Sequence, residues 1–170
     1  LETRRSDNNG DANLPRRTPG LTAIQLLKLE NAWDYLNLER SANQTGVNNA
    51  TFIDVAYDTI NAGSSFGTAF SFSTTSGDIT LNEAGLYLIF ANTSVQKADN
   101  NTRTQYNQRF TLDGVEVAGS ETTTYVRGNE NTSNGVAAIG RIISATAGQV
   151  LNVEVNKEAS IGTNGVIQGG

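Results

Sequence analysis

Residues 78–95, DITLNEAGLYLIFANTSV, decide the fold class. In the first part, apolar Ile79 and Leu81 alternate with polar neighbours, which is the pattern of a strand with one buried face. The turn that follows contains Gly85, and glycine adopts positive φ without a Cβ clash. The next segment, 86–91, is apolar at every position, so the strand that it forms needs cover on both sides. We expect a second sheet on one side and a neighbouring subunit on the other.

Short segments of the same kind recur along the chain, and turn residues separate them. The chain contains 17 glycines and only 17% charged residues, which favours short strands with many turns. Nine strands are predicted, at Thr51–Tyr57, Ser65–Ser73, Ile79–Leu81, Leu86–Val95, Thr104–Leu112, Val115–Ala118, Thr122–Arg127, Val136–Ser144 and Val150–Val155. This pattern predicts one all-β domain over 50–170, a two-sheet antiparallel sandwich.

Three motifs in this domain resemble the C1q/TNF-like jelly-roll family. They are AGLYLIF at 84–90, the Asp-Gly hairpin FTLDGVEV at 110–117, and IISATAGQVLNVEV at 142–155. The motifs stand in the order of the family and together span about 51–158. The resemblance implies a jelly-roll sandwich that assembles as a trimer. The chain departs from the family at 161–170, where the family has an aromatic-rich last strand.

Residues 1–20 form a polar, asparagine-rich segment that precedes the sandwich. We predict an extended arm, because Pro15 and Pro19 exclude a continuous helix. Two pairs of adjacent arginines give the arm two basic spots: Arg4, Arg5, Arg16 and Arg17. These arginines are candidates for anchoring the chain to an acidic partner surface, although a solvated tail has the same composition.

Residues 21–40 are predicted to form one amphipathic helix. Thr22 and Gln25 match a T-x-x-Q capping box, which indicates a helix start. Four apolar residues then recur at intervals of three, four and three and lie along one helical seam: Leu26, Leu29, Trp33 and Leu36. So short a helix is not stable alone in water, so it packs either on its own domain or on copies of itself. The seam is therefore a candidate subunit interface, and a polar linker over 41–49 follows it.

The residue types of common catalytic and metal sites are missing. Histidine and cysteine are absent, which removes the usual general base, a Ser-His-Asp triad, thiolate ligands and disulfides. Glu116, Glu121 and Glu130 stand among polar residues of expected surface loops, where a raised pKa is not expected. The acidic stretches 7–11 and 99–101 lack the spacing of a calcium loop. We expect no enzyme activity, no cofactor and no metal.

The charge distribution limits the classes of partner. Residues 1–40 carry six basic and six acidic side chains, so residues 41–170 carry the whole net charge of −5. An acidic domain is a poor partner for nucleic acid. No apolar run reaches the roughly 18 residues that span a bilayer, so no membrane partner is expected. Because the chain contains no methionine, we expect that Leu1 is not the translational start.

These features predict a virion structural protein. We expect a homotrimeric capsid decoration, or cement, protein of a tailed phage, anchored on the major capsid protein by its N-terminal arm and helix and displaying a C1q/TNF-like knob on the capsid surface. Tyr87 and Phe90 are expected either in the core or at the threefold subunit interface. The alternative is a receptor- or glycan-binding knob of a phage fibre, or a bacterial or secreted C1q-like adhesin. In that case the loops 97–103 and 122–134 carry the binding residues.

Overall fold

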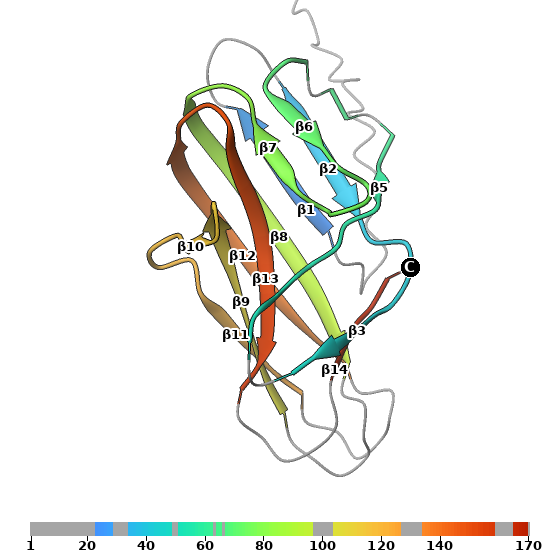
Figure 1. Ribbon diagram of the computed structural model, residues 1–170. Helices are drawn as coiled ribbons and strands as arrows, with labels where there is room; N and C mark the ends of the chain where they lie inside the picture. The colour runs from blue at the N-terminus through green and yellow to red at the C-terminus, as the bar shows by residue number, and fades with distance from the viewer. Residues whose placement is uncertain are drawn as a thin grey trace, which may run out of the picture.

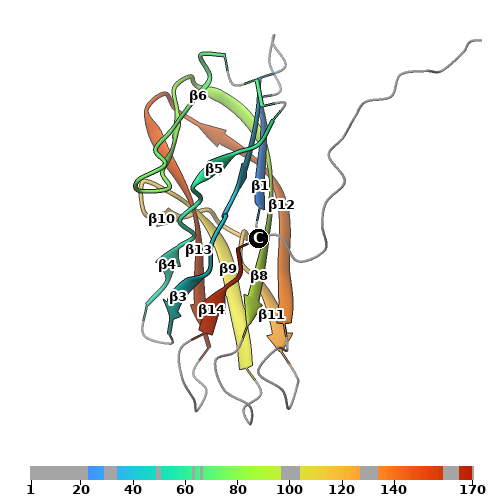
Figure 2. The same cartoon turned by 90° about the vertical axis from the view of Figure 1, so that its right-hand side faces the viewer.

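The computed structural model describes residues 23–28, 34–48, 51–62, 64–65, 67–96, 104–126, 134–158 and 165–169. All 14 elements in these ranges are β-strands, and they form two antiparallel sheets of seven strands each. Figure 2 shows the two sheets edge-on as separate layers. The β-sandwich that the sequence predicts is therefore confirmed. Within the described residues, no helix is long and apolar enough to cross a membrane.

Sheet A is built around the long strand β8. One edge of β8 pairs with β12 along its whole length, and the other edge pairs with β1 and β14. The sheet contains β1 (Ala23–Lys28), β2 (Tyr35–Glu39), β3 (Gln44–Val47), β5 (Thr59–Ile60), β8 (Gly85–Gln96), β12 (Asn134–Ala145) and β14 (Gly165–Ile167).

Sheet B is built around the paired strands β9 and β13 and covers the inner side of sheet A (Figure 1). β10 and β11 pair with the outer edge of β9, while β4 and β7 pair with the other edge of β13. The sheet contains β4 (Ile53–Asp54), β6 (Phe70–Phe72), β7 (Ile79–Leu81), β9 (Thr104–Leu112), β10 (Val115–Glu116), β11 (Thr122–Val126) and β13 (Gln149–Lys157).

Four of the pairings are nested in the sequence. The outermost is β3 with β14, followed by β7 with β13, β8 with β12, and β9 with β11. β3, β14, β8 and β12 belong to sheet A, whereas β7, β13, β9 and β11 belong to sheet B. The chain from β3 to β14 is thus folded back on itself like one long hairpin, whose strand pairs alternate between the two sheets.

The core lies between the sheets and follows from period-two alternation. Along β8, Tyr87, Ile89 and Ala91 point inward and are fully buried. From β9 and β13, Phe110 and Val153 meet them from the opposite sheet. The ring of Tyr87 packs edge-on against Phe70, with ring centroids 5.7 Å apart, and its hydroxyl donates to the Glu83 carbonyl. Residues 78–95 therefore contribute β7, β8 and several core side chains, as the sequence predicts.

The helix predicted over 21–40 is wrong where the structure describes this segment. Residues 23–28 and 35–39 form β1 and β2, which pair with each other in sheet A. Leu26 lies directly opposite Leu36 in this pairing, and both are buried in the core. Two of the four apolar residues that fit one helical seam, Leu26 and Leu36, are thus cross-strand partners. Burial against the sandwich stabilises the strands more than helix propensity stabilises an isolated short helix.

All nine strands predicted beyond residue 50 have a counterpart in the structure, but two of them are much shorter than predicted: β4 covers only Ile53–Asp54 of Thr51–Tyr57, and β6 covers only Phe70–Phe72 of Ser65–Ser73. The sequence reading missed β5 and β14, and it placed a linker where β3 lies. The predicted arm, 1–20, lies outside the described residues.

Candidate functional site

Sheet A exposes several large apolar side chains on the side that faces away from sheet B, where Glu39 of β2 and Asn92 of β8 also point outward. We call the apolar part of this side the outer face of sheet A, and its residues are Gln25, Tyr35, Leu86, Leu88, Phe90, Val136, Ala138, Gly140 and Ile142. Exposed fractions on this face are high for large apolar side chains: 43% for Leu86, 46% for Phe90, 48% for Val136 and 59% for Ile142. None of the described side chains that point outward from β8 and β12 is charged. Exposed apolar side chains grouped on one face are a candidate binding surface.

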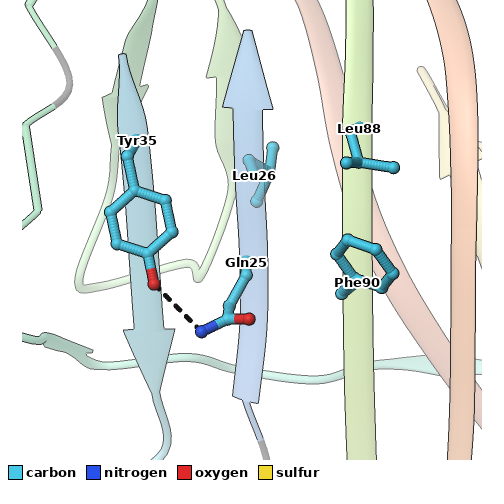
Figure 3. A pocket seen from close by; sticks show the side chains of 5 residues that line it. All are labelled: Gln25, Leu26, Tyr35, Leu88 and Phe90. Carbon is cyan, nitrogen blue, oxygen red and sulfur yellow. Dashed lines mark hydrogen bonds between the residues drawn. The ribbon is translucent and has the colours of Figure 1, made fainter. Parts of the chain in front are cut away.

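A hollow of about 140 Å³ lies on this face, between β2, β1 and β8. Figure 3 shows its walls, which are Tyr35 on one side and Leu88 with Phe90 on the other, with Gln25 and Leu26 between them. The Gln25 amide nitrogen donates to the Tyr35 hydroxyl at 2.9 Å, which joins β1 to β2 across the hollow. The walls are mostly carbon, so the hollow suits an apolar side chain.

A glycine sets the position of Phe90. Gly140 lies opposite Phe90 in the β8–β12 pairing. A Cβ at Gly140 would lie 2.6 Å from Cε1 of Phe90, closer than carbon atoms approach each other. The absent side chain therefore leaves room for the Phe90 ring beside the β12 backbone, and Phe90 also lines the hollow from β8.

The residues predicted for the subunit interface fall into three groups. Leu26, Leu36 and Tyr87 are at most 1% exposed and pack inside their own chain. Their assignment to a subunit interface is therefore corrected: the side chains are core residues because period-two alternation turns them inward. Phe90 is exposed on the outer face of sheet A. The rest of the seam, Leu29 and Trp33, lies outside the described residues.

Other predicted positions also lie outside the described residues. These are the arginines proposed for anchoring, Arg4, Arg5, Arg16 and Arg17, and the loop 97–103. Of the second loop, 122–134, the residues Thr122–Val126 form β11 and Asn134 begins β12. The structure therefore leaves the anchoring and receptor-binding roles as predictions.

The outward side of sheet B is polar and centres on Arg109. The Arg109 guanidinium contacts Glu154 at 2.7 Å and Glu116 at 3.2 Å. It also lies 3.8 Å from the ring centre of Phe52, a cation–π contact. Beside this group, partial burial raises the pKa of Asp54, and the negative charge of Glu154 adds to the effect. The network stabilises the attachment of β4 to β13.

The described residues show no arrangement for metal chemistry. No group of three or more acidic side chains within them has the geometry to hold a metal ion. Of the three carboxylates considered in the sequence, Glu116 pairs with Arg109, Glu121 is exposed, and Glu130 lies outside the described residues.

Sequence reasoning missed Ile142, Val136, Gln25 and Tyr35 as surface-site residues. A signal was present in β12, where Val136, Ala138, Gly140 and Ile142 occupy alternate positions without a charge. A strand with one solvated face normally carries polar residues at such positions. Their absence makes this face of β12 a candidate contact surface.

Comparison with models of known protein families gives no match to this chain, and comparison with curated proteins gives none either.

Proposed function

We propose that the protein is a homotrimeric structural protein with a jelly-roll domain, and that it decorates and reinforces the capsid of a tailed phage. The observation that carries this proposal is the outer face of sheet A. Four large apolar side chains there are more than 40% exposed, and no charge lies among the described side chains pointing outward from β8 and β12. A patch of this kind is costly to leave in water, and a second copy of the chain can cover it.

The nested pairing of strands supports a jelly roll as the fold within the sandwich. A jelly roll is an eight-stranded hairpin rolled into two sheets. The pairs β3–β14, β7–β13, β8–β12 and β9–β11 have that order and alternate between the sheets. The three sequence motifs that resemble the C1q/TNF-like family lie on strands of this set, on β10 and on the turns between them. That family is trimeric, which is the reason for proposing three subunits.

The decoration role rests on the arm and on the place where it joins the sandwich. The arm precedes β1, which lies in sheet A next to β8. In a trimer that buries the outer face of sheet A, three arms leave from strands close to the subunit contacts. Each arm, with its arginine pairs, then reaches across an acidic shell. A protein that binds the assembled shell but not its separated subunits stabilises the shell by mass action.

Binding to phage heads tests this function. Purified protein is mixed with heads that lack it, and the heads are sedimented to measure the bound fraction. A chain lacking residues 1–20 is expected to remain trimeric and to lose binding. A matched variant with Arg4, Arg5, Arg16 and Arg17 all changed to Lys keeps the charge and is expected to bind. Normal binding by the truncated trimer would show that the arm is not needed for binding. Failure of the intact trimer to bind any head would overturn the decoration role.

A further inference from the structure

One side of the sandwich ends in a long strand with an unpaired edge. On this side, β12 ends sheet A, and β10 and β11 end sheet B (Figure 1). β12 pairs with β8 along all 12 of its residues, and no other described strand pairs with it. Alternate residues of an antiparallel strand turn their backbone N–H and C=O groups away from the partner strand. These groups of β12 form what we call the free edge.

The composition of β12 is that of an edge to which another strand can add. The strand contains no proline, and its pairing with β8 runs without a bulge. Arg141 is its one charged residue. A long, regular edge with few charges offers its free backbone groups to any extended chain, and native proteins protect such edges against this pairing.

Arg141 points toward the inside of the sandwich. It alternates with Ala137, Ile143 and Ala145, which are buried on the inward side of β12. Its guanidinium donates a hydrogen bond to the carbonyl of Gly119, in the turn between β10 and β11. A Cβ at Gly119 would lie 2.8 Å from Nη2 of Arg141, so the absent side chain leaves room for this contact. Arg141 therefore joins the last strand of one sheet to the rim of the other.

The first part of the free edge has a different neighbour. A Cβ at Gly135 would lie 2.9 Å from Cγ2 of Val126 and 3.0 Å from Oγ1 of Thr124, so β11 packs closely beside the start of β12. Gly119 precedes β11 in the chain and lies beside the later part of β12, at Arg141. Side chains of β11 thus flank one half of the edge, and Arg141 spans the other half.

A strand added to the free edge would enclose the Arg141 guanidinium. The added strand would lie about 4.8 Å from β12, and its inward side chains would fill the space beside position 141. None of the ion pairs among the described residues includes Arg141. Its described acceptor is one neutral carbonyl, whereas a guanidinium has five N–H donors. Burial of a charge that lacks a partner of opposite charge is costly, so Arg141 opposes the addition of a strand.

We propose that Arg141 keeps the free edge of β12 closed to strand addition, so that sheet A ends at this strand. Without the charge, the edge accepts the β12 strand of a second copy, in antiparallel orientation. The inference goes beyond the proposed function, because it concerns the rim of the sandwich and depends neither on a trimer nor on a capsid.

Three substitutions at one position test the role of the charge. Arg141→Thr removes the charge, Arg141→Lys keeps it, and Arg141→Asp loses the contact with Gly119 but leaves a charge at the edge. Sedimentation is measured in about 1 M NaCl, which screens differences in net charge. Arg141→Thr is expected to form species larger than those of the natural chain at concentrations at least tenfold lower, and the other two variants are expected to match the natural chain.

Net charge does not explain this expected pattern. The threonine variant carries one more net negative charge than the natural chain, so repulsion between its copies is stronger. An Arg141→Thr variant with the mass of the natural chain would overturn the inference. Equal association of Arg141→Thr and Arg141→Asp would also overturn it, because loss of the Gly119 contact would then be sufficient.

Hydrogen exchange of the β12 amides locates the contact and includes the natural chain. Amides bonded to β8 are expected to exchange slowly in every variant, which also shows that the variant is folded. Amides on the free edge are expected to exchange fast in the natural chain and slowly in the Arg141→Thr assembly. Slow exchange of the free-edge amides in the natural chain would show that the edge is already covered and would contradict the inference. Fast exchange of these amides in the assembly would place the contact elsewhere, with the same consequence.

Discussion

Truncation of the Leu26–Leu36 pair tests the assignment of residues 23–39 to sheet A. Leu26 is 0% exposed and Leu36 is 1% exposed, and they face each other across β1 and β2. On its other side, Leu26 lies opposite buried Ile89 of β8. Because Leu26 has buried neighbours on both sides, the surrounding side chains cannot easily move in to fill the cavity that Leu26→Ala leaves. The substitution is therefore expected to lower the free energy of unfolding by about 3–5 kcal/mol.

The assay is urea unfolding followed by far-UV circular dichroism, at one protein concentration for all variants because self-association adds to stability. Gln25→Ala is the matched control. It changes the next residue of the same strand, but on the outer face, and it removes one hydrogen bond, so it is expected to cost about 1 kcal/mol. In the double variant Leu26→Ala/Leu36→Ala, contact between the two side chains predicts a coupling energy of about 0.5–3 kcal/mol. A coupling energy near zero, or equal costs for Leu26→Ala and Gln25→Ala, would refute the strand pairing.

Three further predictions concern the two outer surfaces. Gly140→Ala puts a Cβ where the Phe90 ring lies, 2.6 Å from its Cε1, so the ring must move. Sedimentation should then show severalfold weaker self-association, while the circular dichroism spectrum is unchanged. Asp54 has a raised pKa in the fold, so the folded chain holds its proton more tightly than the unfolded chain, and stability falls as pH rises through that value. Asp54→Asn should therefore be more stable than the natural chain in urea at pH 7, with the difference lost below about pH 4; equal stability at pH 7 would contradict the raised pKa. Arg109→Met removes the interactions with Glu154, Glu116 and Phe52 and should cost about 1–2 kcal/mol in low salt and less in 1 M NaCl; a cost that does not depend on salt would argue against the ion pairs.

The central strands of the sandwich could be predicted because their signal is local. Ile79 and Leu81 alternate with polar residues, and 86–91 is apolar throughout, so β7 and β8 follow from neighbouring residues alone. The cover expected on both sides of β8 is confirmed on the inner side, where sheet B lies over Tyr87 and Ile89. On the outer side it stays a prediction.

The first two strands were missed because their spacing fits two structures. Leu26 and Leu36 are ten residues apart, a distance that matches both a helical seam and opposite positions in a hairpin. Periodicity in a short apolar segment does not separate these possibilities. The alternation in LNLE at 36–39 was the better signal, because the two leucines alternate there with polar residues.

The hollow could not be predicted because it depends on long-range register. Gln25 lies beside Phe90 only because β1 pairs with β8, and Phe90 lies over Gly140 only because β8 pairs with β12. A one-residue shift in either pairing would turn these side chains to the other side of the sheet. Local patterns do not fix register between strands that are distant in the sequence.

The mass of the natural chain in solution tests the central claim most directly. Sedimentation equilibrium over a wide range of concentrations measures it without a variant or a partner. Burial of the outer face of sheet A in a closed ring predicts a species of three times the 18.1 kDa of one chain. A mass of 18.1 kDa at every concentration would contradict the account, because Phe90 and Ile142 would then remain exposed to water.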